Sequence, residues 1–439
     1  MRDMNILVVG SGGREHALVW ALHRSPVVRR LYCAPGNPGI AGLATTFPVK
    51  ADDIAGMMAI AQREKIDLTV VGPEQPLAGG IVDAFQRNGL TIFGPTQRAA
   101  ALEWSKGFAK NFMARHRIPT ARYAMVGAEE VPGAHAALQN FTPPIVLKAD
   151  GLAAGKGVVI CDNANEAHAV LDSMLSGSGF GEAGRHVVIE EFLEGEEASV
   201  FAITDGNKYV LLAPAQDHKR ALDGDRGKNT GGMGAYAPAP VVTEEILRLA
   251  EAEILRPTLA GMASEGRPYQ GCLYIGLMLT PKGPKVVEYN CRFGDPETQV
   301  VLPLFRGDLA TTLLAAARGN LAEAPSPEWR PGDPATSACV VLAAGGYPDH
   351  YETGDRIDGL QELDSHEGVV ALHAGTRREG SDIVTAGGRV LGISAMCEDG
   401  GLARTLGRCY EAVEKIHFNN MHYRRDIGHR ALKGPHSSR

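Results

Sequence analysis

Short apolar runs alternate with amphipathic stretches through the first hundred residues. The runs NILVVG, RLYCAP, LTVVG and LTIFG have the length of β-strands. Between them lie REHALVWALHR, ADDIAGMMAIAQREK and LAGGIVDAFQRNG, whose apolar residues recur at helical spacing. Strands that alternate with helices along a chain are typical of a parallel sheet covered by those helices. The pattern predicts an α/β protein whose N-terminal domain, residues 1–103, contains a doubly wound parallel sheet.

The chain changes character from about Glu103. A helix is predicted over EWSKGFAKNFMARH, followed by a small β-rich unit. HVVIEEFLEGEEASVFAITDG and KYVLLAPAQDHKR are expected to form adjacent strands of a larger sheet. The polar segment 216–236 lacks periodicity, which indicates a binding loop or lid, with an ordinary surface loop as the alternative. The Pro-rich AEAPSPEWRPGDPATS marks a boundary before a mostly β domain, residues 326–432, and residues 433–439 are expected to be a disordered tail.

Composition excludes several classes of protein. A hydrophobic content of 44% and a charged content of 22% are typical of soluble globular proteins. The net charge of −7 argues against a protein dedicated to nucleic acid. No apolar run approaches the ~18 residues that a membrane span needs, and a strand follows the first residues so closely that we expect no signal peptide. The seven cysteines lack any C-x-x-C pair, so we expect reduced thiols in a cytoplasmic protein.

Residues 148–157, KADGLAAGKG, raise the question of a phosphate-binding loop. They do not form a P-loop, because only three residues separate Gly151 from Gly155 and Gly157 replaces the hydroxyl that would bind Mg²⁺. The flanking PIVLKAD and GVVICDN both have strand character. The stretch is therefore predicted to be the tip of a glycine-rich β-hairpin.

The sequence VVGSGGREHA joins the first predicted strand to the first helix. Backbone N–H groups at a helix start can bind phosphate. In a dinucleotide fingerprint the third glycine allows close helix–strand packing, but Glu15 stands at that position, and the second strand ends in CAPGN without an acid. We therefore expect Gly10, Ser11, Gly12 and Gly13 to bind a sugar phosphate; an NAD site and a tight turn without a ligand are the alternatives.

VVEYNCRFGDPET, residues 286–298, indicates a metal site. Side chains alternate between the faces of a strand, so Glu288, Asn290 and Arg292 are expected to project together. A carboxylate and an amide oxygen suit Mg²⁺ bound to a nucleoside triphosphate. Arg292 would then stabilise the charge of a transferring phosphoryl group. The alternative is a solvated strand face.

Two further observations are weaker. The acidic turn in VIEEFLEGEEAS could present backbone groups to adenine and Glu197 to a ribose, although acidic surface turns are common. The histidines lack the spacing of metal ligands, and no G-x-S-x-G elbow is present. We therefore do not expect the protein itself to supply a nucleophile.

Taken together, these motifs resemble the glycinamide ribonucleotide synthetases, a family of ATP-grasp ligases. The resemblance runs from about residue 4 to about residue 432, and its most specific parts are NCRFGDPETQ and GSGGREHA. Other parts, in chain order, are PGNPG, FGPT, SKGFAKNFM, LKADGLAAGKGVV, EEFLEGEEAS, QDHKR, NTGGMGAY and DIGHRAL.

The resemblance implies an ATP-grasp central domain, residues 104–124 and 190–325, with a β-rich lid over residues 125–189. ATP would lie between the lid and the central sheet, with its adenine at residues 190–193 and its ribose at Glu197. The ATP-binding residues implied are Lys106, Lys148, Gly151, Gly155, Lys156, Gly157, Glu190, Glu191, Phe192, Leu193 and Glu197.

The same resemblance implies a divalent ion, Mg²⁺ or Mn²⁺, on Glu288 and Asn290. Asp217 and Arg292 are the expected catalytic residues and would contact glycine. The phosphoribosylamine site would comprise Gly10, Ser11, Gly12, Gly13, Glu74 and Asp295.

The implied activity is the ATP-dependent ligation of glycine to 5-phosphoribosylamine in purine biosynthesis. Phosphoryl transfer from ATP would give glycyl phosphate, which the amine attacks, and the protein would position the reactants and exclude water. The alternatives are an ATP-grasp ligase with another phosphoribosyl or carboxylate substrate, an NAD-dependent oxidoreductase and a non-catalytic nucleotide sensor. We expect a monofunctional monomer or weak dimer that binds small molecules and neither nucleic acid nor membranes.

Overall fold

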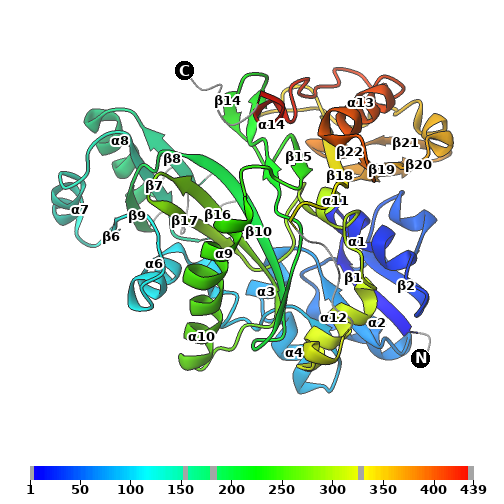
Figure 1. Ribbon diagram of the computed structural model, residues 1–439, viewed down its shortest axis with the longest axis horizontal. Helices are drawn as coiled ribbons and strands as arrows, with labels where there is room; N and C mark the ends of the chain where they lie inside the picture. The colour runs from blue at the N-terminus through cyan, green and yellow to red at the C-terminus, as the bar shows by residue number, and fades with distance from the viewer. Residues whose placement is uncertain (1–3, 152–156, 178–184, 325–330, 434–439) are drawn as a thin grey trace.

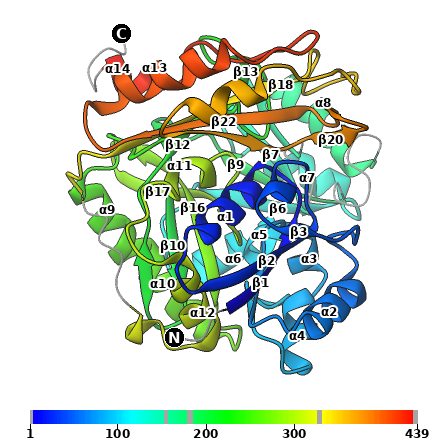
Figure 2. The same ribbon diagram turned by 90° about the vertical axis from the view of Figure 1, so that its right-hand side faces the viewer.

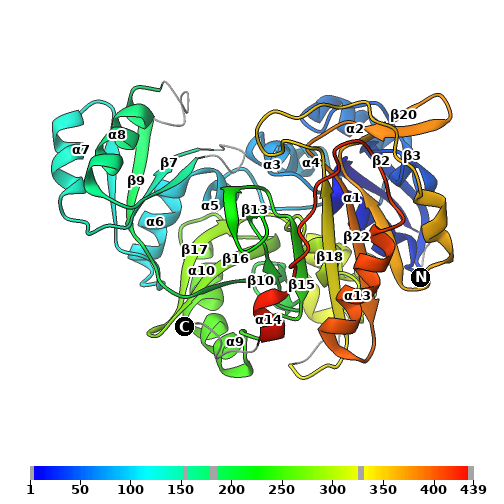
Figure 3. The ribbon, with the colours of Figure 1, turned by 90° about the horizontal axis from the view of Figure 1, so that it is seen from above.

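A computed structural model describes residues 4–151, 157–177, 185–324 and 331–433. Figure 1 shows the part here called the lid, which contains α7 (Val131–Leu138) and α8 (Ala164–Leu175), at one side of the molecule. The N-terminal and C-terminal parts lie at the other side. Seen from above, the lid stands apart from both of these parts, and the central strands lie between (Figure 3).

The N-terminal sheet is parallel, with the strand order β3-β2-β1-β4-β5, which confirms the predicted doubly wound sheet. The stretch predicted as one helix over residues 77–89 is two short helices, because Gly80 adopts the left-handed conformation at φ +82°. The strands are β1 Met4–Gly10, β2 Val28–Pro35, β3 Thr45–Thr46, β4 Leu68–Val71 and β5 Ile92–Phe93. The helices are α1 Gly13–His23, the 3₁₀ turn η1 Ile40–Gly42, α2 Ile54–Arg63, α3 Glu74–Ala78 and α4 Ile81–Arg87.

The lid is an antiparallel sheet with the order β6-β9-β7-β8. Strands β7 and β8 pair from Ile145↔Cys161 to Lys148↔Val158, which confirms the predicted hairpin. Its tip includes Gly155 and Lys156, which lie outside the described residues. The lid elements are β6 Tyr123–Gly127, α7 Val131–Leu138, β7 Ile145–Ala149, β8 Val158–Cys161, α8 Ala164–Leu175 and β9 His186–Glu191.

The central sheet has the order β11-β10-β16-β17. Its strands are β10 Glu196–Thr204, β11 Tyr209–Leu211, β16 Gly271–Thr280 and β17 Gly283–Asn290. The chain thus leaves the lid sheet at the end of β9, Glu191, and enters the central sheet at the start of β10, Glu196. β10 and β11 are neighbours, as expected.

Helices flank the central sheet. The helix predicted over residues 103–116 is broken at Ser105, whose backbone is extended and whose hydroxyl accepts a hydrogen bond from Phe108 N, capping the second helix. These helices are α5 Ala101–Trp104, α6 Lys106–Arg115, α9 Glu244–Ala250, the π-helical turn η3 Glu251–Leu255, α10 Arg256–Ser264, α12 Leu309–Arg318 and the 3₁₀ turn η4 Leu321–Glu323. The short helix α11 Thr298–Val301 instead contacts α1 and the C-terminal sheet.

The C-terminal sheet takes two strands from the middle of the chain, in the order β12-β15-β18-β22-β19. The segment 216–236, which was predicted to be a loop, therefore contains strands. The predicted secondary structure of this segment is wrong. Short glycine-rich strands show no apolar alternation, and β15 pairs with β18 about a hundred residues later. The strands of this sheet are β12 Gln216–Asp217, β15 Gly234–Ala237, β18 Thr336–Ala343, β19 Val369–His373 and β22 Arg389–Cys397. Two separate hairpins are β13 Arg220–Leu222 with β14 Arg226–Asn229, and β20 Thr376–Glu379 with β21 Asp382–Thr385. The helices are the 3₁₀ turn η5 Leu360–Ser365, α13 Gly401–Val413 and α14 His429–Lys433.

Shared cores hold these parts together. One buried cluster joins Leu7 and Phe85 of the N-terminal part to Phe112 of α6 and Ile275 of β16. The C-terminal sheet lies over α1 (Figure 2), and α1 contacts β19 and α11. The N-terminal sheet, central sheet and C-terminal sheet thus form a common wall for the site described below. Among the described helices, none is long and apolar enough to cross a membrane.

Candidate active site

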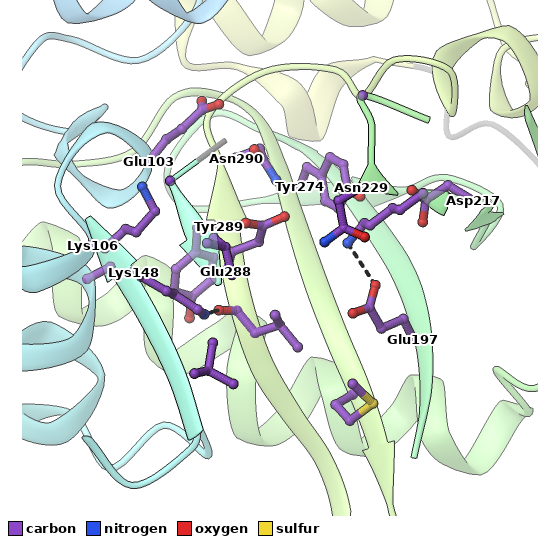
Figure 4. A pocket seen from close by; sticks show the side chains of 18 of the residues that line it. Glu103, Lys106, Lys148, Glu197, Asp217, Asn229, Tyr274, Glu288, Tyr289 and Asn290 are labelled. Atoms are coloured by element: carbon purple, nitrogen blue, oxygen red, sulfur yellow. Dashed lines mark hydrogen bonds and ion pairs between the residues drawn. The ribbon is translucent and has the colours of Figure 1, made fainter. Parts of the chain in front are cut away.

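A cavity of about 570 Å³ lies between the lid and the central sheet, and the N-terminal and C-terminal parts also contribute side chains to it. Figure 4 shows Lys106 and Lys148 on one side of this cavity and Asp217 and Glu197 on the other, with Glu288 and Asn290 between them. The predicted site residues that line it are Glu74, Lys106, Lys148, Gly151, Gly157, Glu190, Glu191, Phe192, Leu193, Glu197, Asp217, Glu288, Asn290, Arg292 and Asp295.

On the lid side, a buried carboxylate lies between two lysines. Glu190 is 3.0 Å from Lys148 Nζ and 3.0 Å from Lys110 Nζ. Lys148 Nζ also donates to Val287 O of β17 at 3.1 Å, which connects the lid to the central sheet. Burial lowers the pKa of Lys110 to about 8, although Glu190 opposes this shift. No sequence motif marks Lys110 as buried, because its burial depends on β9 and not on the helix that carries it.

Lys106 begins α6 and holds the start of the hairpin tip. Its Nζ donates to Gly151 O at 2.9 Å, and the neighbouring Gly107 N donates to Asp150 Oδ1. Burial lowers the pKa of Lys106, and the nearby Glu288 carboxylate partly offsets this. The Lys106 and Lys148 side chains thus both line the cavity, each held by a hydrogen bond to a backbone carbonyl.

The metal site proposed from the sequence is supported by the placement of its donors. Glu288 pairs with Gly276 and Asn290 with Tyr274 across β16 and β17, so both lie at the end of β17 that faces the cavity. Within the part of the chain that the structure describes, neither side chain makes a hydrogen bond or an ion pair with the protein. A carboxylate and an amide oxygen that lack protein partners fit a hard divalent ion.

Arg292 lies beyond the end of β17, lines the same cavity as Glu288 and Asn290, and belongs to a buried charge cluster. Its Nη2 is 3.0 Å from Glu103 Oε1 and its Nε is 3.5 Å from Glu74 Oε2. Arg14 lies 3.9 Å from Glu74 on the other side. Burial favours the neutral guanidinium, but Glu103 and Glu74 outweigh it and raise the pKa of Arg292.

Glu103 and Arg14 were missed by sequence analysis. Burial raises the pKa of Glu103, which accepts a hydrogen bond from Cys291 N at 2.7 Å. No local motif marks Glu103, because its partner Cys291 lies 188 residues away.

A second charge cluster faces the metal-site residues. Lys219 Nζ contacts Glu197 Oε2 at 2.7 Å (Figure 4). Burial lowers the pKa of Lys219, but Glu197 and Asp217 more than compensate, so it stays a cation. Burial also raises the pKa of Asp217 to about 7, against the pull of Lys219. Tyr274 OH donates to Glu297 Oε1 at 2.7 Å at the floor of this cluster.

The glycine-rich loop, Gly10 to Gly13, is not among the residues that line the cavity and lies behind Asp295. A side chain added at Gly12 would have its Cβ 3.6 Å from Asp295 Oδ2. Asp295 is 3.2 Å from Arg389 Nη2, so the C-terminal sheet contributes a cation to this end of the site. Arg389 and the neighbouring Tyr347 both line the cavity.

The Glu15 side chain occupies the position that a dinucleotide fingerprint reserves for glycine. Its Oε2 accepts a hydrogen bond from Gly12 N, and its Oε1 accepts one from Arg14 Nε at 2.6 Å. The carboxylate therefore already binds the backbone N–H at the start of α1. This arrangement argues against an NAD pyrophosphate at the loop.

Gly72→Ala is expected to destabilise the protein by about 1–3 kcal/mol, the range for inserting atoms into a packed site. A Cβ at Gly72 would lie 2.1 Å from Glu15 Oε1, so the carboxylate would have to move away from Gly12 N. Thermal unfolding of the variant measures this loss. Gly42→Ala is the control, because no atom lies within 4 Å of the position of its added Cβ; an unchanged midpoint for Gly72→Ala would contradict the packing described.

Two sheets that enclose a cavity, with a glycine-rich hairpin on one sheet and the Glu288–Asn290 pair on the other, are typical of an ATP-grasp enzyme. Matches to family models agree with this fold: the N domain of phosphoribosylglycinamide synthetase matches residues 4–103, its ATP-grasp domain residues 104–298 and its C domain residues 337–430. The chain belongs to the phosphoribosylglycinamide synthetase family and is a ligase.

Relatives support this assignment over the whole chain. The phosphoribosylamine–glycine ligase of Chlorobaculum tepidum is 51% identical and that of Allochromatium vinosum 52%, each over 98% of this chain and 99–100% of the relative. The crystal structure of the Thermotoga maritima phosphoribosylamine–glycine ligase has a TM-score of 0.83 at 36% identity and covers 96% of this chain and all of its own. Biotin carboxylase of Campylobacter jejuni shares the fold, with a TM-score of 0.72 at 15% identity over 98% of this chain and 95% of its own.

Proposed function

We propose that the protein ligates glycine to 5-phosphoribosylamine, with release of ADP and phosphate, as a step of purine biosynthesis. The observation that carries the proposal is the cavity in which the Glu288 and Asn290 side chains face Lys106 and Lys148. Among the described residues, neither Glu288 nor Asn290 makes a side-chain hydrogen bond or an ion pair. This arrangement suits a triphosphate held between cations and a divalent ion. The relatives named phosphoribosylamine–glycine ligase support the choice of substrates.

Lys106 and Lys148 would bind the phosphates of ATP, and Gly151 and Gly157 would let the hairpin backbone approach them. Glu190 to Leu193, where the chain passes from lid to central sheet, would line the adenine, and Glu197 would accept the ribose hydroxyls. Glu288 and Asn290 would hold Mg²⁺ or Mn²⁺, which would neutralise charge on the phosphates. Gly155 and Lys156 complete the proposed hairpin site.

The two substrates would bind beyond the γ-phosphate. Asp217 would hold the ammonium group of glycine, and Arg292 would hold its carboxylate and the developing charge of the acyl phosphate. The phosphoribosylamine would lie at Glu74 and Asp295, next to the loop of Gly10, Ser11, Gly12 and Gly13. The amine nitrogen of phosphoribosylamine then forms a bond to the carbonyl carbon of the acyl phosphate. Phosphate leaves with the electron pair of the broken C–O bond.

We also propose the domain boundaries expected above: residues 1–103, 104–124 with 190–325, 125–189 and 326–432. All seven cysteines are free and buried, which supports a reducing compartment such as the cytoplasm. We propose a monomer or weak dimer that acts only on small molecules.

The test supplies the full chain with ATP, Mg²⁺ and fresh phosphoribosylamine, and compares glycine with alanine, formate and other carboxylates by the ADP and ligated product formed. We expect product only with glycine. Product with another acid and none with glycine would overturn the proposal in favour of a related ATP-grasp ligase. Replacing Mg²⁺ with Mn²⁺ in the same assay identifies the preferred ion.

The KM for glycine is expected to rise about tenfold between pH 8 and pH 6. Burial raises the pKa of Asp217 to about 7, so the carboxylate is protonated below that pH and loses its attraction for the ammonium group. Initial rates at several pH values measure this change. Asp217→Asn should show a high KM that no longer varies with pH, whereas Asp52→Asn, on an exposed loop, should behave as the wild type. A pH-dependent KM in Asp217→Asn would contradict the role.

A further inference from the structure

The residues of QDHKR alternate between two surroundings. Asp217 and Lys219 line the cavity, whereas His218 between them is fully buried and does not. Strand β12 ends at Asp217, and its backbone pairing with the β15 side continues one residue further, because His218 N donates to Gly234 O at 2.9 Å and Met233 N donates to His218 O at 2.8 Å. Since side chains alternate along a strand, the position of His218 sets the direction of its two charged neighbours.

The side of the strand that carries His218 packs against the end of the chain. His218 Nε2 accepts a hydrogen bond from Gly428 N at 2.9 Å, and its ring centroid lies 5.2 Å from that of His429. Burial lowers the pKa of His218 to about 4, so the ring is neutral at physiological pH and Nε2 is free to accept. Residues 424–430, here called the C-terminal segment, thus contact the strand directly.

Ion pairs fix the C-terminal segment to the β13–β14 hairpin that follows the strand. Arg424 is fully buried, contacts Asp225 Oδ1 at 2.8 Å and donates to both oxygens of Asp426 at 2.8 Å. Arg430 Nη2 is 2.7 Å from Asp225 Oδ2. Asp426 Oδ2 also accepts a hydrogen bond from Gly224 N, which closes the network across about 200 residues of sequence.

A metal ion is the obvious alternative for this cluster, because His218, Asp225 and His429 offer ligand atoms within 4.8 Å of one another. The hydrogen bonds argue against it. Nε2 of His218 is occupied by Gly428 N–H, so Nδ1 of the neutral ring carries the proton and offers no lone pair. Asp225 is already neutralised by two guanidinium groups. His218 Nδ1 itself makes no hydrogen bond among the described residues, and the Asp225 Oδ1 atom lies 3.8 Å from it.

We propose that His218, held by the C-terminal segment, is a positioning residue that directs Asp217 and Lys219 into the active-site cavity. This inference rests on the proposed function. The two side chains carry opposite charges in a cavity that also contains Glu197, Glu288 and Glu297, so a rotated strand would pair them with the wrong neighbours. Displacing groups that bind a reactant by about 1 Å can cost on the order of 100-fold in rate.

The test compares His218→Leu with His218→Gln in the full chain. Leucine cannot accept the Gly428 hydrogen bond, whereas the glutamine Oε1 can reach the position of Nε2. We expect His218→Leu to lower kcat on the order of 10–100-fold, with the KM for ATP nearly unchanged, and His218→Gln to recover most of the loss. Unchanged kcat in His218→Leu, or no recovery in His218→Gln, would overturn the proposal.

A matched control separates positioning from loss of stability. Val413→Ala creates a cavity in the same C-terminal part without touching the network, so it should lower Tm and leave kcat unchanged. An equal fall of kcat in Val413→Ala at a similar Tm would overturn the proposal. If His218→Leu does not fold, Arg430→Gln replaces it, because that guanidinium is partly exposed and its removal leaves no buried cavity.

A double-mutant cycle gives an independent readout. Lys219→Met removes one of the positioned groups, so adding His218→Leu to it should cost much less than in the wild type, measured by single-turnover rates. If the fold-losses in single-turnover rate of His218→Leu and Lys219→Met multiply in the double variant, the two residues act independently and the inference is contradicted. Failure of the wild type to use glycine would instead refute the proposed function, and the cycle would then be measured on the carboxylate that supports ADP release.

Discussion

Glu288→Gln is expected to lower kcat about 1,000-fold at saturating ATP, a loss of about 4 kcal/mol in transition-state stabilisation. Glu288 supplies the only carboxylate of the proposed metal pair, and the amide of glutamine is a neutral and weaker ligand. Initial rates over a range of Mg²⁺ and Mn²⁺ concentrations measure the effect. The concentration of metal needed for half-maximal activity should rise at the same time.

The control for Glu288→Gln is Glu245→Gln, on the exposed first turn of α9. It makes the same chemical change away from the cavity and should leave the rate and the metal requirement unchanged. Asn290→Ala should reproduce the altered metal requirement of Glu288→Gln. Wild-type turnover in Glu288→Gln would show that the ion, if bound, lies elsewhere, and would remove the central support for the proposed mechanism.

Arg292→Lys is expected to lower kcat about 100–1,000-fold, the cost typical of removing a preorganised donor that stabilises a developing anion. Lysine keeps the charge but loses the planar fork that contacts Glu103 and Glu74 together. The lysine ammonium group would pair with one of these two carboxylates and leave the other without its ion pair. Steady-state kinetics with glycine varied should show a fall in kcat larger than the rise in KM.

Arg318→Lys provides the comparison, because Arg318 lies on the exposed end of α12. It should match the wild type in rate and in unfolding temperature. Arg292→Met is expected to be more severe, since breaking a buried ion pair costs about 3–5 kcal/mol in stability. If Arg292→Lys retained full kcat, the guanidinium would serve the charge cluster alone and would not contact the reacting groups.

The C-terminal part contributes to the site in two ways. Arg389 and Tyr347 line the cavity near Asp295, at the end proposed for phosphoribosylamine and not at the adenine end. The C-terminal segment contacts the strand of Asp217 and Lys219 from outside the cavity. The sequence alone left open whether this part merely packs, because neither Arg389 nor Arg424 lies in a motif with recognisable chemistry.

The sequence by itself determined the features that depend on short-range spacing. Alternating apolar runs and amphipathic stretches predicted the parallel N-terminal sheet, and strand-like flanks around KADGLAAGKG predicted the β7–β8 hairpin. The carboxylate and amide at positions 288 and 290 could be predicted to lie together, because a strand places alternate residues on one face, and both line the cavity. The resemblance to the ligase family rested on such local motifs in a constant order.

Only the tertiary structure decided which charged residues are buried together. Lys110 meets Glu190, Glu103 meets Arg292, and His218 meets Gly428, across 80, 189 and 210 residues of sequence. Each of these side chains would be solvated on its own element, and burial and pairing change its role only when distant segments fold against one another. The strands within 216–236 were missed because they are short and polar, and because β15 joins the C-terminal sheet by pairing with β18 about a hundred residues later as well as with β12.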